Sequence, residues 1–285
     1  MMAPMGFTVE REGPIATLVV TGPWDDEARH VVESGSVTGL RLNYALGFAE
    51  PDLGFLDPSW GIKRLELVDR SIADLGRLEC LTTLVELTVA AAPGAKIDLS
   101  ALGELRSLGA RWGTVADSID QATQLMDLRT SDYLGTDLEP LRAHVSLNRL
   151  AIRGAPSLKS LSGIADLPSL GHLMVARARR LRDLAALIGL RETLVELELE
   201  DCPQIGSIEA VTNLTRLEFL GVSDCGTLES LKPLVSLENL RTLHAWGSTT
   251  VDDNDLTPLR SLSRHRLTEI RMKSRRTYQP RLEDL

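Results

Sequence analysis

The residues that could perform acid–base chemistry are few and lie far apart in the chain. The five histidines are His30, His144, His172, His244 and His265. If His172 lies on a strand beside strands carrying Asp127, Arg149 and Glu196, an imidazole and carboxylates would meet, as general acid–base catalysis requires. Such neighbours are more often simple cross-strand pairs. The sequence also has no Gly-rich phosphate loop, no H-E-x-x-H and no G-x-S-x-G. We therefore expect no catalytic activity and no cofactor.

The three cysteines, Cys80, Cys202 and Cys225, form no C-x-x-C pair and no disulfide framework. This spacing favours structural cysteines over metal ligands or nucleophiles. Residues 1–13 contain no apolar signal segment, and no stretch approaches 18 apolar residues. The sequence therefore predicts a cytoplasmic protein that does not bind membranes.

Residue types that are typical of binding surfaces gather in the middle and second half of the chain. A basic band with an aromatic residue comprises Arg111, Trp112, Arg129, Asp132, Arg149, Arg153, His172 and Arg177. An acidic band follows, and then a histidine and a tryptophan: Glu196, Glu198, Glu200, Asp201, Asp224, His244 and Trp246. Exposed tryptophan and arginine dominate the binding energy of many interfaces. Charge on a strand face also serves solubility alone, so both interpretations stay open.

These side chains share a face only if regular elements position them, and a repeated leucine phrase predicts such elements. L-x-x-L-x-L, or a close variant, returns every 20–27 residues. Its first positions are Val37, Ile62, Leu84, Leu105, Leu125, Leu147, Leu170, Leu194, Leu217, Leu240 and Leu267. Self-similarity of this period indicates a solenoid, in which each unit buries its apolar face against its neighbours.

Each repeat predicts one short strand and a thin return segment. Alternating apolar residues, such as Leu197 and Leu199, predict eleven parallel strands whose remaining side chains point outward. In the return segments the leucines are spaced by threes, which favours 3₁₀ turns or coil over α-helix and predicts a gently curved arc. Two longer units, Asp183–Ile188 and Ser118–Met126 with Ser118 as N-cap, are candidates for a true helical turn.

Residues 37–275 resemble the leucine-rich repeat family, whose consensus is L-x-x-L-x-L-x-x-N/C-x-L. The leucines spaced by threes are most similar to the bacterial internalin-like subgroup, with repeats of the 22-residue class. The resemblance implies an α/β solenoid that binds protein partners through a parallel concave sheet. At the consensus asparagine position this chain carries mostly small residues, Cys202 and Cys225 among them. We therefore expect both cysteines to be buried beneath the turns, and backbone or water to pair the groups that asparagine would satisfy.

The ends of the chain depart from the repeat and predict caps. Phe7–Arg11 and Ile15–Val20 alternate around Glu12-Gly13-Pro14, which indicates a β-hairpin. Asp25 then precedes a predicted helix over Asp26–Ser34. We expect an N-terminal cap over 1–36, repeats over 37–262, and a last strand with a basic C-terminal cap over 263–285.

The charge distribution separates an acidic body from a basic end. From Arg260 onward eight basic residues stand against three acidic ones, a net +5; since the whole chain carries −9, the rest carries −14. The acidic body disfavours nucleic acid as a partner. We expect a monomer that binds another protein through its concave face. One alternative is an inhibitor or immunity-type protein that neutralises a basic toxin or nuclease. Another is a scaffold that contacts nucleic acid through its basic C-terminal end.

Overall fold

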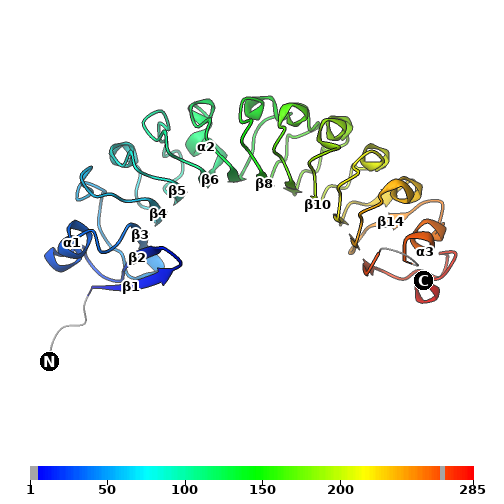
Figure 1. The fold of residues 1–285 in the computed structure, drawn as a ribbon, viewed down its shortest axis with the longest axis horizontal. Helices are drawn as coiled ribbons and strands as arrows, with labels where there is room; N and C mark the ends of the chain where they lie inside the picture. Colours follow the sequence, from blue (N-terminus) through cyan, green and yellow to red (C-terminus); the bar gives the residue numbers. More distant parts are fainter. Residues whose placement is uncertain (1–5, 264–266) are drawn as a thin grey trace. The chain divides into compact units, whose positions relative to one another are not determined.

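The computed structural model describes residues 6–263 and 267–285 and shows a leucine-rich repeat solenoid. The chain divides into two compact units, Met1–Arg129 and Thr130–Leu285. In each unit the strands lie on the inner side of the ribbon and the return segments on the outer side (Figure 1). Strand β7 (Asp127–Ser131) contains the boundary between the units.

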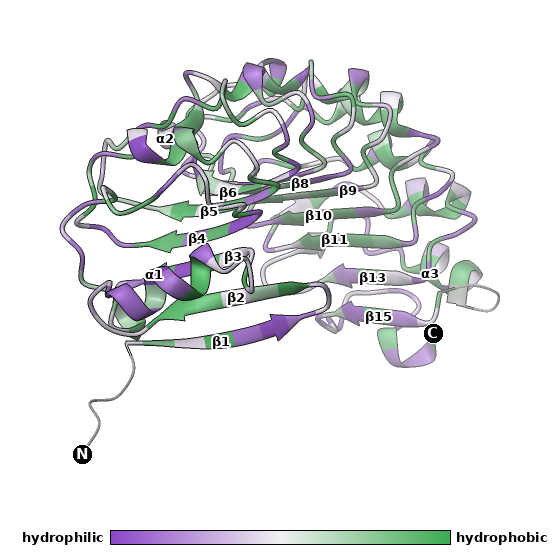
Figure 2. Ribbon diagram, turned by 60° about the vertical axis from the view of Figure 1, so that its left-hand side comes forward, coloured by the Kyte–Doolittle hydropathy of each residue, from purple (hydrophilic) through white to green (hydrophobic). Residues whose placement is uncertain are grey.

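Unit 1 begins with the hairpin and helix that the sequence predicts. Strands β1 (Phe7–Glu12) and β2 (Ile15–Val20) are antiparallel, with Phe7 opposite Val20. Helix α1 (Asp26–Glu33) starts at Asp25, whose carboxylate accepts a 2.7 Å hydrogen bond from the backbone N–H of Ala28. Figure 2 shows a hydrophilic and a hydrophobic side on this helix. The predicted β-hairpin-plus-helix cap is confirmed.

The remaining strands of unit 1 follow in sequence order. They are β3 (Gly39–Asn43), β4 (Arg64–Val68), β5 (Glu86–Ala90) and β6 (Ser107–Arg111), each parallel to the one before, and β3 is parallel to β2. The connecting turns are η1 (Tyr44–Leu46), η2 (Gly76–Cys80), α2 (Trp112–Val115) and η3 (Ile119–Gln121). The alternate leucines predicted to point inward are buried, as Leu40 and Leu42 illustrate.

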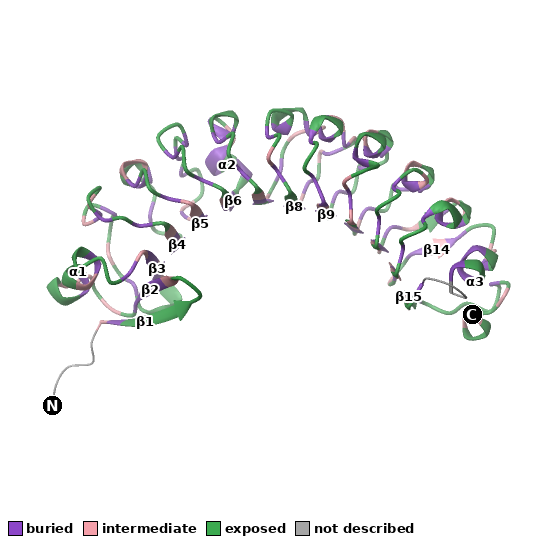
Figure 3. Ribbon diagram, viewed as in Figure 1, coloured by how far each residue is buried: buried purple, intermediate pink, exposed green. Residues whose placement is uncertain are grey.

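Unit 2 repeats the same plan. Its strands β8 (Arg149–Arg153), β9 (His172–Ala176), β10 (Glu196–Glu200), β11 (Phe219–Ser223), β13 (Thr242–Ala245) and β15 (Glu269–Met272) are parallel and in order. A second, two-stranded sheet joins β12 (Thr227–Leu228) to β14 (Thr250–Val251). The 3₁₀ turns are η4 (Glu139–Leu141), η5 (Ile164–Asp166), η6 (Ala185–Leu190), η7 (Glu209–Val211), η8 (Lys232–Ser236) and η9 (Leu282–Asp284). Leucines spaced by threes therefore specify 3₁₀ turns, and Figure 3 shows the return segments exposed outward and buried inward.

Both segments proposed for a true helical turn differ from that expectation. Asp183–Ile188 leads into the 3₁₀ turn η6, because its buried leucines recur every third residue. In Ser118–Met126 the only helical piece is the 3₁₀ turn η3, and the short α2 precedes it. Ser118 does not act as a side-chain cap. Its hydroxyl donates to Ile97 O and accepts from Leu99 N, at 3.0 and 3.1 Å, and so ties neighbouring repeats together. The sequence also missed α3 (Thr257–Ser263) in the last long unit.

Cysteine thiols satisfy backbone groups at the position where the family carries asparagine. Cys202 and Cys225 are fully buried, as expected. The Cys225 thiol lies 3.3 Å from Leu199 O, and that of Cys202 lies 3.4 Å from Glu200 O. Hydrogen bonding with Cys202, together with burial, raises the pKa of the Cys225 thiol. These contacts support a structural role for both cysteines.

Candidate functional site

Three of the predicted partner-binding residues, Arg111, Trp112 and Arg129, belong to unit 1. Arg111 and Arg129 are exposed, and the Arg129 guanidinium contacts Asp127 at 3.4 Å. Trp112 is a correction: it is only 6% exposed, because the chain turns into α2 directly after Arg111 and places the indole in the core. Its side chain therefore does not lie on the strand face.

The other twelve predicted residues belong to unit 2, where they lie on the strands or within two residues of a strand end. We call the outward side of β8, β9, β10, β11, β13 and β15 the strand face of unit 2. Its register aligns the predicted residues in rows: His172 stands opposite Arg149 on one side and Glu196 on the other. Glu198, Gly221 and His244 form the next row across β10, β11 and β13. The register brings basic residues to the β8 side and acidic residues to β10.

Much of this charge is unpaired. Within the described residues, Arg149 and Arg153 on β8 and Glu198 and Glu200 on β10 form no ion pair. His172 differs, since its Nδ1 lies 2.8 Å from Glu196 Oε2. Unpaired charges of opposite sign on neighbouring parts of one sheet offer complementary contacts to a charged partner.

The turns that follow β7, β8, β9, β10, β11 and β13 each contain a residue in the left-handed backbone region. Asp132, Arg177, Asp201 and Asp224 have φ of 56°, 57°, 49° and 54°, and glycine occupies the equivalent positions in the repeats of β8 and β13. The backbone N–H of Asp201 donates to Ser223 O of the next repeat at 3.0 Å. Asp201 also lies 3.6 Å from Arg179. These four predicted residues therefore connect neighbouring repeats at the end of the strands through their backbone N–H groups, in addition to lying at the surface.

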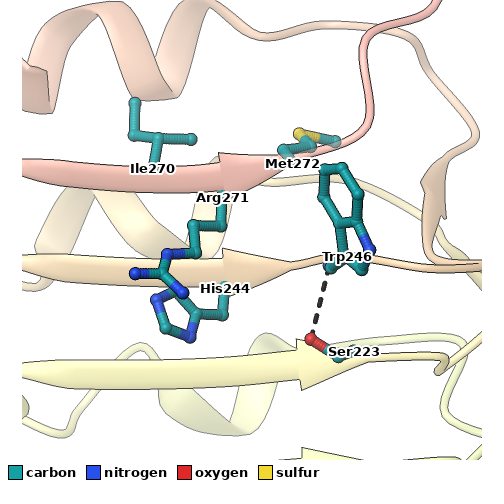
Figure 4. Close-up of a pocket in the computed structure, with 6 residues that line it drawn as sticks. All are labelled: Ser223, His244, Trp246, Ile270, Arg271 and Met272. Atoms are coloured by element: carbon teal, nitrogen blue, oxygen red, sulfur yellow. Dashed lines mark hydrogen bonds between the residues drawn. The ribbon is translucent and has the colours of Figure 1, made fainter.

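The last strands of unit 2 carry a hollow of about 510 Å³, which we call the Trp246 hollow. It is lined by Ser223, His244, Trp246, Ile270, Arg271 and Met272 (Figure 4). Trp246 is 58% exposed, and its backbone N–H donates to Ser223 Oγ at 3.3 Å. His244 packs edge-on against Phe219 at 5.0 Å between ring centroids.

Sequence reasoning found two residues of this hollow, His244 and Trp246, and missed the contribution of β15. Arg271 is an exposed residue of the last strand, whereas Met272 beside it is buried. Glu269 connects the two strands: its Oε1 lies 3.3 Å from His244 Nε2 and 2.5 Å from Arg271 Nε. The hydrogen bond from His244, with a further one from Arg271, lowers the pKa of the Glu269 carboxyl. The outward position of Arg271 in the repeat was the signal that could have pointed to β15.

Among residues 6–263 and 267–285, no group of three His, Cys, Asp or Glu side chains is arranged to hold a metal ion. In the same ranges no helix combines the length and the apolar composition needed to cross a membrane. Arg264 and Arg266, which belong to the predicted basic C-terminal cap, lie outside the described residues.

Comparison with solved structures confirms the fold. An internalin of Listeria monocytogenes aligns with 89% of this chain and 73% of its own, at 18% identity and a TM-score of 0.58. A TDR receptor aligns with 88% of this chain at 16% identity and a TM-score of 0.61, and the match spans 46% of the receptor chain. No protein-family model matches the sequence. No curated protein matches it either. The chain therefore has an internalin-like leucine-rich repeat fold, as its repeat predicts.

Proposed function

We propose that this chain is a non-catalytic protein-interaction module and that its partner binds the strand face of unit 2. The observation that carries the proposal is Trp246, which is 58% exposed although it directly follows a paired strand. A large aromatic side chain held on a fixed backbone is the residue type that most often anchors an interface. The solenoid core is built from buried leucines, so the outward residues are the ones available for recognition.

The charge pattern supports a protein partner that carries acidic and basic residues at fixed positions on its surface. The unpaired arginines of β8 and the unpaired glutamates of β10 would face acidic and basic residues of the partner, respectively. Such complementarity orients two proteins and accelerates their encounter. The open strand face suits a macromolecule, because small ligands favour enclosed pockets.

The test begins with affinity capture of the partner from the native host and its identification by mass spectrometry. The purified partner is then titrated against the variant Trp246→Ala with Glu198→Lys. Loss of an anchor and reversal of a charge should weaken binding at least about thirtyfold. The control is Val235→Ala with Glu229→Lys, which also truncates an exposed apolar side chain and reverses an exposed negative charge, but outside the strand face. If both variants bind as tightly as the wild type, the strand face is not the binding surface.

A second candidate function is inhibition of a basic toxin or nuclease, and one observation favours it. Glu198 and Glu200 are unpaired within the described part of the chain and stand on the same strand, in a body of net charge −14 over residues 1–259. An acidic surface steers a basic protein toward itself, and salt screens the attraction. The association rate with such a partner should fall steeply between low and physiological ionic strength. A rate indifferent to salt contradicts this candidate and leaves the first one standing.

A further inference from the structure

The Trp246 hollow combines four side chains that each interact favourably with an aromatic ring. Figure 4 shows the indole of Trp246 beside Met272 at one end, and Arg271 alongside His244 at the other. Indole and imidazole stack with aromatic rings, a thioether sulfur packs against them, and a guanidinium binds their negative face. Ser223 adds a hydroxyl at the border.

The side chains of His244 and Arg271 are held by their neighbours before any partner arrives. Glu269 contacts both Arg271 and His244, and the His244 ring also packs against Phe219. The backbone of Trp246 is fixed by its hydrogen bond to Ser223. Preorganised walls reduce the ordering cost of binding, which is where many exposed side chains lose affinity.

We propose that the Trp246 hollow receives one aromatic side chain of the protein partner, inserted between the Trp246 indole and the Arg271 guanidinium. This inference rests on the proposed function of the strand face and adds the chemistry of the anchor residue.

The charges around the hollow select among possible occupants. A cationic side chain would meet Arg271 and, two residues on, Lys273. A carboxylate would find the Arg271 guanidinium already paired with Glu269, whose negative charge repels it. An aliphatic side chain would fill space but would gain nothing from the guanidinium. The face of an aromatic ring is neutral overall, and its negative quadrupole complements Arg271.

The test uses four short peptides with blocked ends, Gly-Tyr-Gly, Gly-Leu-Gly, Gly-Arg-Gly and Gly-Glu-Gly, added to the full chain at millimolar concentration. Binding is followed by NMR through the indole N–H of Trp246 and the methyl group of Met272. The Trp246 signal is assigned by its loss in Trp246→Phe. We expect Gly-Tyr-Gly to shift both signals with a saturable ring-current effect and to bind more tightly than the other three.

Variants of the residues that line the hollow test whether the NMR shifts report binding there. Trp246→Ala, read through Met272, should weaken Gly-Tyr-Gly binding about tenfold, and Arg271→Gln should weaken it about two- to fivefold. Arg276→Gln removes the same charge from an exposed residue that does not line the hollow, and should leave the affinity unchanged.

The inference is overturned if no peptide shifts either signal, if the leucine, arginine or glutamate peptide binds as tightly as the tyrosine peptide, or if Trp246→Ala binds like the wild type. Failure of this inference can be told apart from failure of the proposed function. If only the inference fails, the captured partner still binds more weakly to Trp246→Ala with Glu198→Lys, and the anchor residue belongs to another chemical class.

Discussion

The interior of unit 2 accommodates polar groups where a backbone carbonyl is available to them. The buried hydroxyl of Thr249 donates to Val222 O at 2.5 Å, and the thiol of Cys225 lies 3.3 Å from Leu199 O. Thr130 is an exception, since its buried hydroxyl has no hydrogen-bond partner within the described residues. An unsatisfied buried hydroxyl lowers stability, because it loses its hydrogen bonds to water without replacement.

Thr130→Val should therefore raise the free energy of unfolding by about 1 kcal/mol, since valine has the same shape without the hydroxyl. Chemical denaturation followed by circular dichroism measures the change. Thr249→Val serves as the matched control. Its hydroxyl both donates to Val222 O and accepts from Cys225 N, so the same substitution there should be destabilising. Equal effects at the two positions would contradict the argument.

The Glu269 carboxyl should respond to loss of His244. Its pKa lies below the ordinary 4.5 because the folded state favours the charged form, mainly through His244. The stabilisation is therefore fully present above pH 4.5 and is lost as the pH falls through the lowered pKa. In His244→Ala an NMR titration of Glu269 should show the pKa moving upward. Arg281→Gln, whose guanidinium contacts Glu283, should leave it in place. An unchanged Glu269 pKa in His244→Ala would rule out the contact.

The turns after the strands carry the main backbone strain of unit 2. Asp, Asn and Gly tolerate the left-handed region, whereas most other residues pay about 1 kcal/mol or more there. Arg177, with φ of 57°, is the one residue at this set of positions that is none of the three. Gly247, with φ of 72°, is favoured for a second reason, because a Cβ there would displace the Asp224 carboxylate from its hydrogen bond with Ser248 N.

Arg177→Gly should raise the free energy of unfolding by about 0.5–1 kcal/mol, because the relief of steric strain outweighs the chain entropy that glycine adds to the unfolded state. Thermal unfolding with calorimetry measures the difference. Arg180→Gly, at an exposed position without a positive φ, should change stability in the opposite direction. If both substitutions destabilise, the left-handed conformation of Arg177 is not strained.

Both ends of the solenoid need a cover, because a terminal repeat has a neighbour on one side only. At the start, β2 pairs with β3 and buries Leu18 and Val20. At the end, Tyr278 is fully buried and its hydroxyl accepts a hydrogen bond from Val251 N.

The predicted domain limits, the monomeric state and the cytoplasmic location stay predictions.

Deletion of residues 1–36 should turn the chain into an aggregating species, because it exposes the edge of β3 and the buried Leu40 and Leu42. Size-exclusion chromatography with light scattering reports the change. Glu10→Gln with Glu12→Gln removes only the ion pairs to Arg41 and Arg64. Because exposed ion pairs contribute little, this variant should elute like the wild type. A deletion variant that elutes as a compact species at the wild-type oligomeric state would show that the cap is dispensable.

The sequence predicts this fold well because the repeat is redundant: eleven copies of the strand pattern place alternate, mostly apolar side chains toward the core. It predicts the 3₁₀ turns for the same reason. It misplaces Trp112, because a single tryptophan after a strand can turn inward when the next residues form a helix. It also misses half of the Trp246 hollow, since that site depends on the pairing of β13 with β15 across 27 residues rather than on a local pattern.

The hollow lies on the terminal pair of strands, and this position connects recognition to local order. In a stack of repeats the outermost pair opens most easily, so amide hydrogens of β15 should exchange faster than those of the interior β10. A ring that contacts Trp246 on one side and Arg271 on the other would fasten β15 to β13. Binding would then suppress local unfolding of β15, and dissociation of the partner would allow this end of the solenoid to unfold locally again.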